Sequence, residues 1–312
     1  MTETHATPLT TPLEKCIDPT ANGHATQRLP QAGTGEPEEE YELVIRPHTG
    51  WIGINWKELI AGRELLFFLI RRDFSVRYKQ TVLGVAWAVL QPLMMMMVFT
   101  LVFGQFVKVK PPDGIPYPVF VFAGLIPWTL FSQGLVASAL CLVNQQQLLT
   151  KVYFPRLFIP TAAASVFLVD LLISLGIYAA VLLCYGVVPS WGVVFLPFLI
   201  LLTLVATLSI GVTLAALTVF YRDFKHIIPF LVQLLMFLTP AIYYPVENIG
   251  LHWQLILSLN PIFGIINGFR AAIIGGEWNI LSLAISTASA LALFTFALFY
   301  FRKTERWFAD FA

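Results

Sequence analysis

Long apolar runs without charged side chains alternate with short polar segments along most of the chain. Charged residues are absent from residues 80–107, 114–150, 171–221 and 278–301, and residues 226–246 carry only a histidine. A helix that crosses the hydrocarbon layer needs about 20 such residues, whereas a transmembrane β-barrel would show alternating segments of about 10 residues. The pattern therefore predicts an all-α membrane protein with six spanning helices, near residues 82–107, 117–142, 159–185, 193–220, 228–244 and 279–301.

Two further segments have their own patterns. Residues 51–70 carry an apolar stripe that includes Trp56, with basic residues on another face. This is typical of an amphipathic helix in the membrane interface, although an ordinary soluble helix is the alternative. Residues 249–277 are apolar but interrupted by Asn260-Pro261 and Gly275-Gly276. Such breaks predict two short re-entrant helices between the fifth and sixth spans, not a seventh crossing.

The first 50 residues differ from everything that follows. They are rich in Thr, Pro, Gly, Ala and Glu, and residues 36–42 form an acidic run. A composition of this kind predicts a disordered tail, and no apolar stretch behind basic residues marks a signal peptide. The domain organisation is then a tail over residues 1–50, an interfacial helix with a basic segment over residues 51–79, and a six-helix domain over residues 80–312.

The composition excludes several classes of protein. Of the 312 residues, 57 % are hydrophobic and only 12 % are charged, and the mean hydropathy is +0.75. Soluble domains are about 25 % charged, so a soluble enzyme is excluded as the main interpretation. A net charge of +1 gives no basic face for nucleic acid. The three cysteines (Cys16, Cys141 and Cys184) are too far apart for a disulfide framework or a zinc site.

The distribution of Lys and Arg predicts the orientation, because cytoplasmic flanks carry the excess of these residues. With the N-terminus inside, thirteen lie on the cytoplasmic side and three lie outside. Both termini are then cytoplasmic. The outer residues are Lys108, Lys110 and Arg270, and the inner ones are Lys57, Arg63, Arg71, Arg72, Arg77, Lys79, Lys151, Arg156, Arg222, Lys225, Arg302, Lys303 and Arg306.

Motifs for catalysis are absent from the sequence. It contains no GxxxxGK[ST] loop for nucleotide phosphates, no HExxH and no CxxC. We therefore expect no catalytic or metal site and no enzyme activity in this chain. Asp170 is the one acid well inside a predicted span. Such a carboxylate marks a transport pathway or makes a structural hydrogen bond to a neighbouring helix.

An ordered set of short motifs resembles the polysaccharide-exporting ABC-2 permease family, the membrane subunits of O-antigen, capsule and teichoic-acid exporters. The resemblance covers residues 55 to 310, and the tail departs from it. The motifs are the RDFSVRYKQT segment (residues 72–81) with Leu83-Gly84, Trp87 and Leu90-Gln91-Pro92; Gly124 to Trp128; Lys151 to Arg156; Tyr221 to Phe224; Pro240 with Tyr243-Tyr244-Pro245; and Leu259-Asn260-Pro261 followed by Phe269-Arg270.

The resemblance implies an ABC-2 (type V exporter) architecture in the bacterial cytoplasmic membrane. Two copies of the permease, as a homodimer, would pair with two ATPase subunits that bind ATP and magnesium, while this chain holds no cofactor. The substrate would be a polysaccharide or a lipid-linked glycan, such as an O-antigen on undecaprenyl diphosphate. The alternatives are an ABC-2 exporter of a drug or smaller lipid, and a membrane enzyme acting on a polyprenyl-linked sugar.

The resemblance also suggests where substrate enters. The family guides the lipid-linked head group inward near this basic segment, so Arg72, Arg77 and Lys79 are the candidates for contact with the pyrophosphate. Alternatively, Arg72 pairs with the neighbouring Asp73. Candidates for the translocation pathway are aromatic, because apolar rings, with polar tips in Trp and Tyr, suit sugars. They are Trp87, Trp128, Phe131, Tyr243 and Tyr244, together with Asp170, and the alternative for the aromatics is an ordinary interface belt.

The loop between the second and third predicted spans combines exposed apolar and basic residues. Polar residues open it, Pro155 closes it, and an apolar cluster lies between them, which suits a short helix that docks in another protein. The resemblance identifies it as the coupling helix for the ATPase; the alternative is a solvated loop. The candidate contacts are Leu148, Lys151, Tyr153, Phe154 and Arg156, with a second contact at Arg222 and Asp223.

Overall fold

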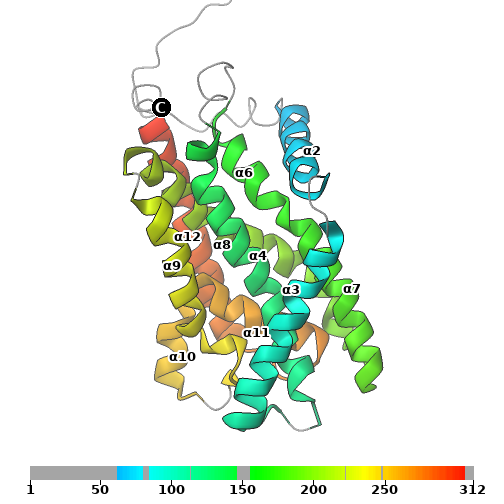
Figure 1. Ribbon diagram of the computed structural model, residues 1–312. Coiled ribbons are helices and arrows are strands. Elements are labelled where there is room, and N and C mark those ends of the chain that lie inside the picture. The colour runs from blue at the N-terminus through cyan, green and yellow to red at the C-terminus, as the bar shows by residue number, and fades with distance from the viewer. Residues whose placement is uncertain are drawn as a thin grey trace, which may run out of the picture. The chain divides into compact units, whose positions relative to one another are not determined.

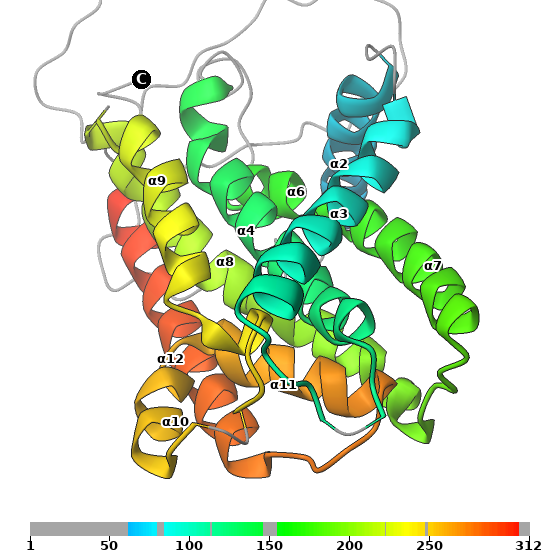
Figure 2. The ribbon, with the colours of Figure 1, turned by 60° about the horizontal axis from the view of Figure 1, so that its bottom comes forward.

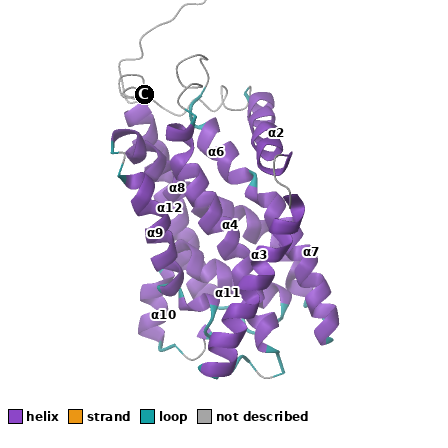
Figure 3. Cartoon of the chain, viewed as in Figure 1, coloured by secondary structure: helices purple, strands orange, loops and turns teal. Residues whose placement is uncertain are grey.

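The computed structural model describes residues 62–79, 84–112, 114–145, 155–221, 223–246 and 249–305 (Figure 1). Within these residues every regular element is a helix (Figure 3). The expectations for residues 1–50 and 51–61 lie outside the described residues. The elements are α2 (Arg63–Lys79), α3 (Gly84–Phe99), the π-helix η1 (Thr100–Phe106), α4 (Tyr117–Asn144), α6 (Phe158–Ser165), α7 (Phe167–Tyr185), the 3-10 helix η2 (Trp191–Phe195), α8 (Leu196–Phe220), α9 (Phe224–Phe237), the 3-10 helix η3 (Pro240–Ile242), α10 (Leu251–Ser258), α11 (Pro261–Ile273) and α12 (Ile280–Glu305).

Among the described residues, five helical segments are long and apolar enough to cross a membrane. They are 21 to 30 residues long and coincide with five of the six predicted spans. Three of them join two elements end to end: α3 with η1, α6 with α7, and η2 with α8. The five segments are Ala86–Phe106, Tyr117–Asn144, Phe158–Tyr185, Trp191–Phe220 and Ile280–Glu305.

The fifth predicted span, residues 228–244, is present as the shorter helix α9. It begins at Phe224 and ends at Phe237, so its 14 residues are apolar but extend only about 21 Å. Pro240 explains the early end, because proline has no backbone N–H to continue the helical hydrogen bonds. The chain instead continues through η3. The helix was thus predicted correctly, but its boundaries were not.

The segment between α9 and α12 forms two short helices, as the sequence predicts. α10 and α11 are bent by 112° relative to each other, which is the geometry of a broken span or a re-entrant loop. The bend occurs at Asn260, whose side-chain oxygen accepts a hydrogen bond from the Ile262 backbone N–H at 3.3 Å. Asn260 therefore caps α11, and Pro261 occupies its first position, where no N–H is needed.

Small polar residues hold this re-entrant pair against α12. The backbone N–H of Gly264 donates to Ser286 Oγ at 3.0 Å, and the hydroxyls of Ser258 and Ser282 lie 2.7 Å apart. A Cβ atom at position 264 would come within 2.5 Å of the Ser282 carbonyl oxygen. Only glycine therefore permits the two helices to approach this closely, as is common between membrane helices.

α4 is the centre of the bundle and contacts α3, α6, α7, α8, α9 and α11 (Figure 2). Of the residues in its most apolar 18-residue stretch, 78 % are buried, whereas the corresponding share for the segment that contains α3 is 11 %. The apolar surface of α3 must therefore meet lipid or another subunit. The bundle has two ends: the "α2 end", which includes Glu305 at the end of α12, and the opposite "α10 end" with the re-entrant pair (Figure 1).

Candidate functional site

At the α2 end, an ion pair joins the basic segment to the third predicted span. One Arg77 guanidinium nitrogen donates to Asp170 Oδ2 at 2.8 Å, and the Tyr78 hydroxyl donates to the other carboxylate oxygen. Asp170 is only 7 % exposed and lies in the first turn of α7. Asp170 thus faces the protein interior, and its partners come from α2.

The environment of Tyr78 keeps its hydroxyl protonated. Burial and the hydrogen bond to Asp170 raise the pKa of Tyr78 from 10.0 to about 12. Both effects disfavour a phenolate, because its charge would be partly desolvated and would lie beside a carboxylate. Tyr78 is therefore a hydrogen-bond donor to Asp170 at any physiological pH.

The Arg77 guanidinium makes two further contacts. It lies 4.2 Å from the centre of the Phe167 ring and donates to the Gln133 side-chain oxygen at 3.3 Å. Arg77 therefore contacts α4 as well as α7. Its side chain is still 37 % exposed, so it can be reached from the surface while it holds Asp170.

Of the other two residues proposed to contact pyrophosphate, one is already paired. Arg72 forms an ion pair with Asp73 at 2.7 Å and donates to the Gln145 side chain at 2.7 Å, just beyond the end of α4. The alternative that Arg72 pairs with Asp73 is therefore what the structure contains. Lys79 is exposed at the last position of α2.

The five aromatic candidates for the pathway are not gathered in one place. Trp128 and Phe131 are buried within the core of α4, with ring centres 5.7 Å apart, so they pack the single chain and do not line its surface. Trp87 is 55 % exposed on α3. Tyr243 and Tyr244 are partly buried just after η3.

Tyr243 belongs to an aromatic cluster that the sequence did not reveal. Its ring stacks on Phe103 with centres 4.5 Å apart, and Phe103 in turn stacks on Phe99. The Tyr243 hydroxyl donates to the Phe237 carbonyl at 2.8 Å, and its own carbonyl accepts from Tyr117 at 2.9 Å. The cluster joins α3 and η1 to the chain after α9.

Arg270 on α11 is a second residue whose contacts the sequence did not predict. Its Nε donates to the Phe120 carbonyl at 3.1 Å, and a terminal nitrogen donates to the Ile242 carbonyl at 2.6 Å. The guanidinium also lies 3.6 Å from the centre of the Phe120 ring. Arg270 therefore links α11 to α4 and η3. The available signal was a single arginine in an otherwise uncharged helix.

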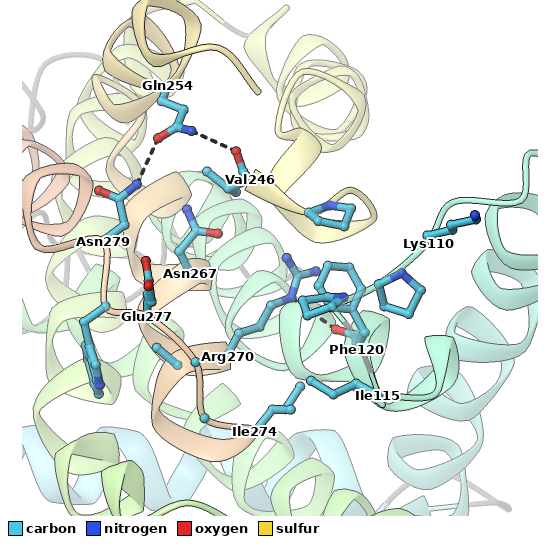
Figure 4. Close-up of a pocket in the computed structure, with 17 residues that line it drawn as sticks. Lys110, Ile115, Phe120, Val246, Gln254, Asn267, Arg270, Ile274, Glu277 and Asn279 are labelled. Carbon is cyan, nitrogen blue, oxygen red and sulfur yellow. Dashed lines mark hydrogen bonds between the residues drawn. The ribbon is translucent and has the colours of Figure 1, made fainter. Parts of the chain in front are cut away.

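The α10 end contains a cavity of about 900 Å³ (Figure 4). Figure 4 shows the amide side chains of Gln254, Asn267 and Asn279 near one another, with Lys110 on the opposite side. Proline and aliphatic side chains form most of the remaining wall. None of the three amides was singled out from the sequence, because they come from three separate parts of the chain: α10, α11 and the segment just before α12.

Most of the expected ATPase contacts cannot be placed. Leu148, Lys151, Tyr153, Phe154 and Arg222 lie outside the described residues. Asp223 is exposed immediately before α9.

Arg156 is described and contacts the end of α12. Its guanidinium donates to the Glu305 backbone carbonyl at 2.6 Å, and its backbone N–H donates to the Glu305 carboxylate at 3.3 Å. Arg156 therefore connects the end of the predicted coupling segment to the last described turn of the chain.

Comparison with known proteins gives consistent matches over most of the chain. A family model described as ABC-2 type transporter matches residues 64–274. The O-antigen export system permease protein RfbA of Myxococcus xanthus is 34 % identical over 217 residues, which are 69 % of this chain and 82 % of that protein. RfbA of Klebsiella pneumoniae is 27 % identical over 79 % of this chain and 94 % of its own length. The polysialic acid transport protein KpsM of Escherichia coli is 27 % identical over 67 % of this chain and 80 % of its own.

Proposed function

The chain belongs to the ABC-2 type transporter family, and on that premise we propose that it is the membrane permease subunit of an ATP-driven polysaccharide exporter. The observation that carries this proposal is the extent of the likeness. An O-antigen export permease is matched over 82 % of its length, which is too much for a single shared motif. The exported molecule would be a polysaccharide or lipid-linked glycan of the O-antigen type.

The chain needs a partner that hydrolyses ATP. Its sequence has no phosphate-binding loop, and a strongly hydrated polymer does not cross about 30 Å of hydrocarbon without work. We propose two copies of this chain with two ATPase subunits, which dock at the segment around Tyr153 and Phe154 and at Arg222. Arg156 supports this location, because it anchors the end of that segment to α12.

The orientation follows from the docking site. The ATPases are cytoplasmic, so the α2 end would face the cytoplasm and the α10 end would face outward. The excess of Lys and Arg at the predicted cytoplasmic flanks agrees with this placement in the bacterial cytoplasmic membrane.

The lipid-linked substrate would approach at the end of α2. Arg77 is partly exposed, and a guanidinium binds phosphate oxygens in a bidentate manner. A diphosphate therefore has the chemistry to share or replace the contact of Arg77 with Asp170. The exposed ammonium group of Lys79 lies two residues further along the same helix.

A deletion strain tests the proposal. Without this chain, the complete glycan should accumulate on its lipid carrier inside the cell, as measured by mass spectrometry of extracted lipid-linked glycans. Expression of the full chain should restore export. If the deletion strain has an unchanged amount of lipid-linked glycan but an altered export of a drug or smaller lipid, the chain belongs to the other kind of ABC-2 exporter. A change in the chemical structure of the lipid-linked sugar would indicate a membrane enzyme.

A further inference from the structure

The cavity at the α10 end is open to a polar ligand and is not used in any step described above. Its volume of about 900 Å³ is within the range of sites that hold drug-sized molecules. Its wall combines the loop before α4, the chain after η3, both re-entrant helices and the segment leading into α12. The re-entrant helices that line it lie at the opposite end of the bundle from α2 (Figure 1).

Two of the three amide side chains are fixed by the protein itself. Asn279 donates to the Gln254 side-chain oxygen at 2.9 Å, and Gln254 donates to the carbonyl oxygens of Val246 and Ile249. The Asn279 side-chain oxygen accepts from the Ser282 backbone N–H at 3.0 Å. These two amides form a rigid polar wall, and their own hydrogen bonds hold it in place.

Asn267 differs from these two amides. It is the one residue of α11 that is not classed as buried, and it lines the cavity. Its side-chain nitrogen is nevertheless shielded from solvent and has no hydrogen-bond partner among the described residues. A donor left without a partner inside the protein is unfavourable, so a ligand hydroxyl that reached it would gain a hydrogen bond.

The remaining polar groups and the walls indicate what kind of ligand fits. Glu277 is an exposed carboxylate on the cavity wall with no ion pair among the described residues. It accepts hydrogen bonds, while Lys110 and Arg270, which also line the cavity, carry positive charge, so the cavity has mixed charge and offers donors and acceptors to a neutral polar ligand. The Arg270 guanidinium donates to the backbone carbonyls of Phe120 and Ile242. Pro111, Ile115 and Ile274 add apolar wall.

A sugar ring matches this combination of groups. One hydroxyl can donate to the Glu277 carboxylate while a second accepts from the Asn267 amide. The C–H face of the ring can pack on the apolar wall that Pro111, Ile115 and Ile274 form. We propose that the cavity binds neutral sugar residues of the exported polymer after they have crossed the membrane. This inference rests on the proposed function and extends it to a second, outward-facing site.

Saturation-transfer NMR on the full-length permease in lipid nanodiscs tests this proposal. The probes are mannobiose and N,N′-diacetylchitobiose, two neutral disaccharides, with glycerol 3-phosphate as an anionic probe. Saturation transfer to a neutral disaccharide is expected with the wild type. Asn267→Leu and Glu277→Gln should each weaken it about threefold to tenfold, as expected for the loss of one hydrogen bond.

The control variant is Gln105→Leu, which removes an exposed amide on η1 that does not line the cavity. It should leave saturation transfer unchanged. Because Asn267→Leu removes an unsatisfied donor, its melting temperature should be equal to or above that of the wild type, which separates lost binding from misfolding.

Three outcomes would overturn the site: no transfer to either disaccharide, transfer in both cavity variants equal to that of the wild type, or stronger transfer to glycerol 3-phosphate, which would indicate a lipid head group. If any of these is found while the deletion strain accumulates the lipid-linked glycan as expected, the cavity is not a sugar site but the exporter function stands. Failure of that accumulation would instead remove the exporter function itself.

Discussion

Arg77 near the end of α2 and Asp170 in the first turn of α7 form a 2.8 Å ion pair across 93 residues of sequence. The sequence placed them in separate roles, with Arg77 at the substrate pyrophosphate and Asp170 in the pathway. In the structure they are one unit, which positions α2 against the spanning helices. Any contact of Arg77 with a diphosphate must therefore affect Asp170 as well.

The two members of this pair should respond differently to substitution. Arg77→Met leaves a buried carboxylate with Tyr78 as its one remaining side-chain donor among the described residues, so we expect a loss of about 1–3 kcal/mol of stability. Asp170→Asn should cost less, because the partly exposed Arg77 can be solvated by water. Thermal unfolding in detergent measures both. A larger loss for Asp170→Asn would contradict this description of the pair.

Tyr78 predicts a stability change at high pH. Its pKa is about 12 in the folded protein and 10.0 ordinarily, so its contribution is complete below pH 10 and is lost as the pH rises towards 12. The difference in melting temperature between the wild type and Tyr78→Phe should therefore be constant from pH 7 to about 9.5 and then shrink. A difference that grows above pH 10 would exclude the hydrogen bond to Asp170.

Gly264→Ala should displace the re-entrant pair. The new Cβ would lie 2.5 Å from the Ser282 carbonyl oxygen, and overpacking of this kind typically costs about 1–3 kcal/mol. The control is Gly176→Ala on α7, where a Cβ meets no atom within 4 Å. It should leave the melting temperature unchanged or raise it slightly, because alanine favours helix. Equal effects of the two substitutions would mean that the α11–α12 contact is not tight.

The ATPase contact predicted from the sequence is tested by replacing Tyr153 and Phe154 with alanine. Buried aromatic anchors carry much of the binding energy at such interfaces, so copurification of the ATPase should fall while membrane insertion stays normal. The control is Tyr185→Ala, which removes an exposed tyrosine at the end of α7. Full export by the double variant would place the docking site elsewhere.

The fold was predictable to the extent that it depends on local composition. Runs without charge identified the spanning helices, and Asn260-Pro261 identified the bend between α10 and α11. The length of α9 was not predicted, because hydropathy continues past Phe237 although Pro240 ends the helical hydrogen bonding.

The candidate sites were less predictable, because they depend on which helices meet. Hydropathy does not distinguish a core-facing ring from an exposed one, so the burial of Trp128 and Phe131 and the exposure of Trp87 could not be separated. The partners of Arg77 and Arg270 come from helices far away in the sequence. The unpaired amide of Asn267 is visible only once the cavity around it is known.

The attachment of α12 at both ends has a mechanical consequence. The helix has 26 residues and is about 39 Å long. Glu305 is held by Arg156 at one end, while Ser282 and Ser286 are held by the re-entrant pair at the other. Because α12 also packs along α8, it forms a continuous connection between the two ends of the bundle. A push on Arg156 from an ATPase would therefore be transmitted along α12 to α11.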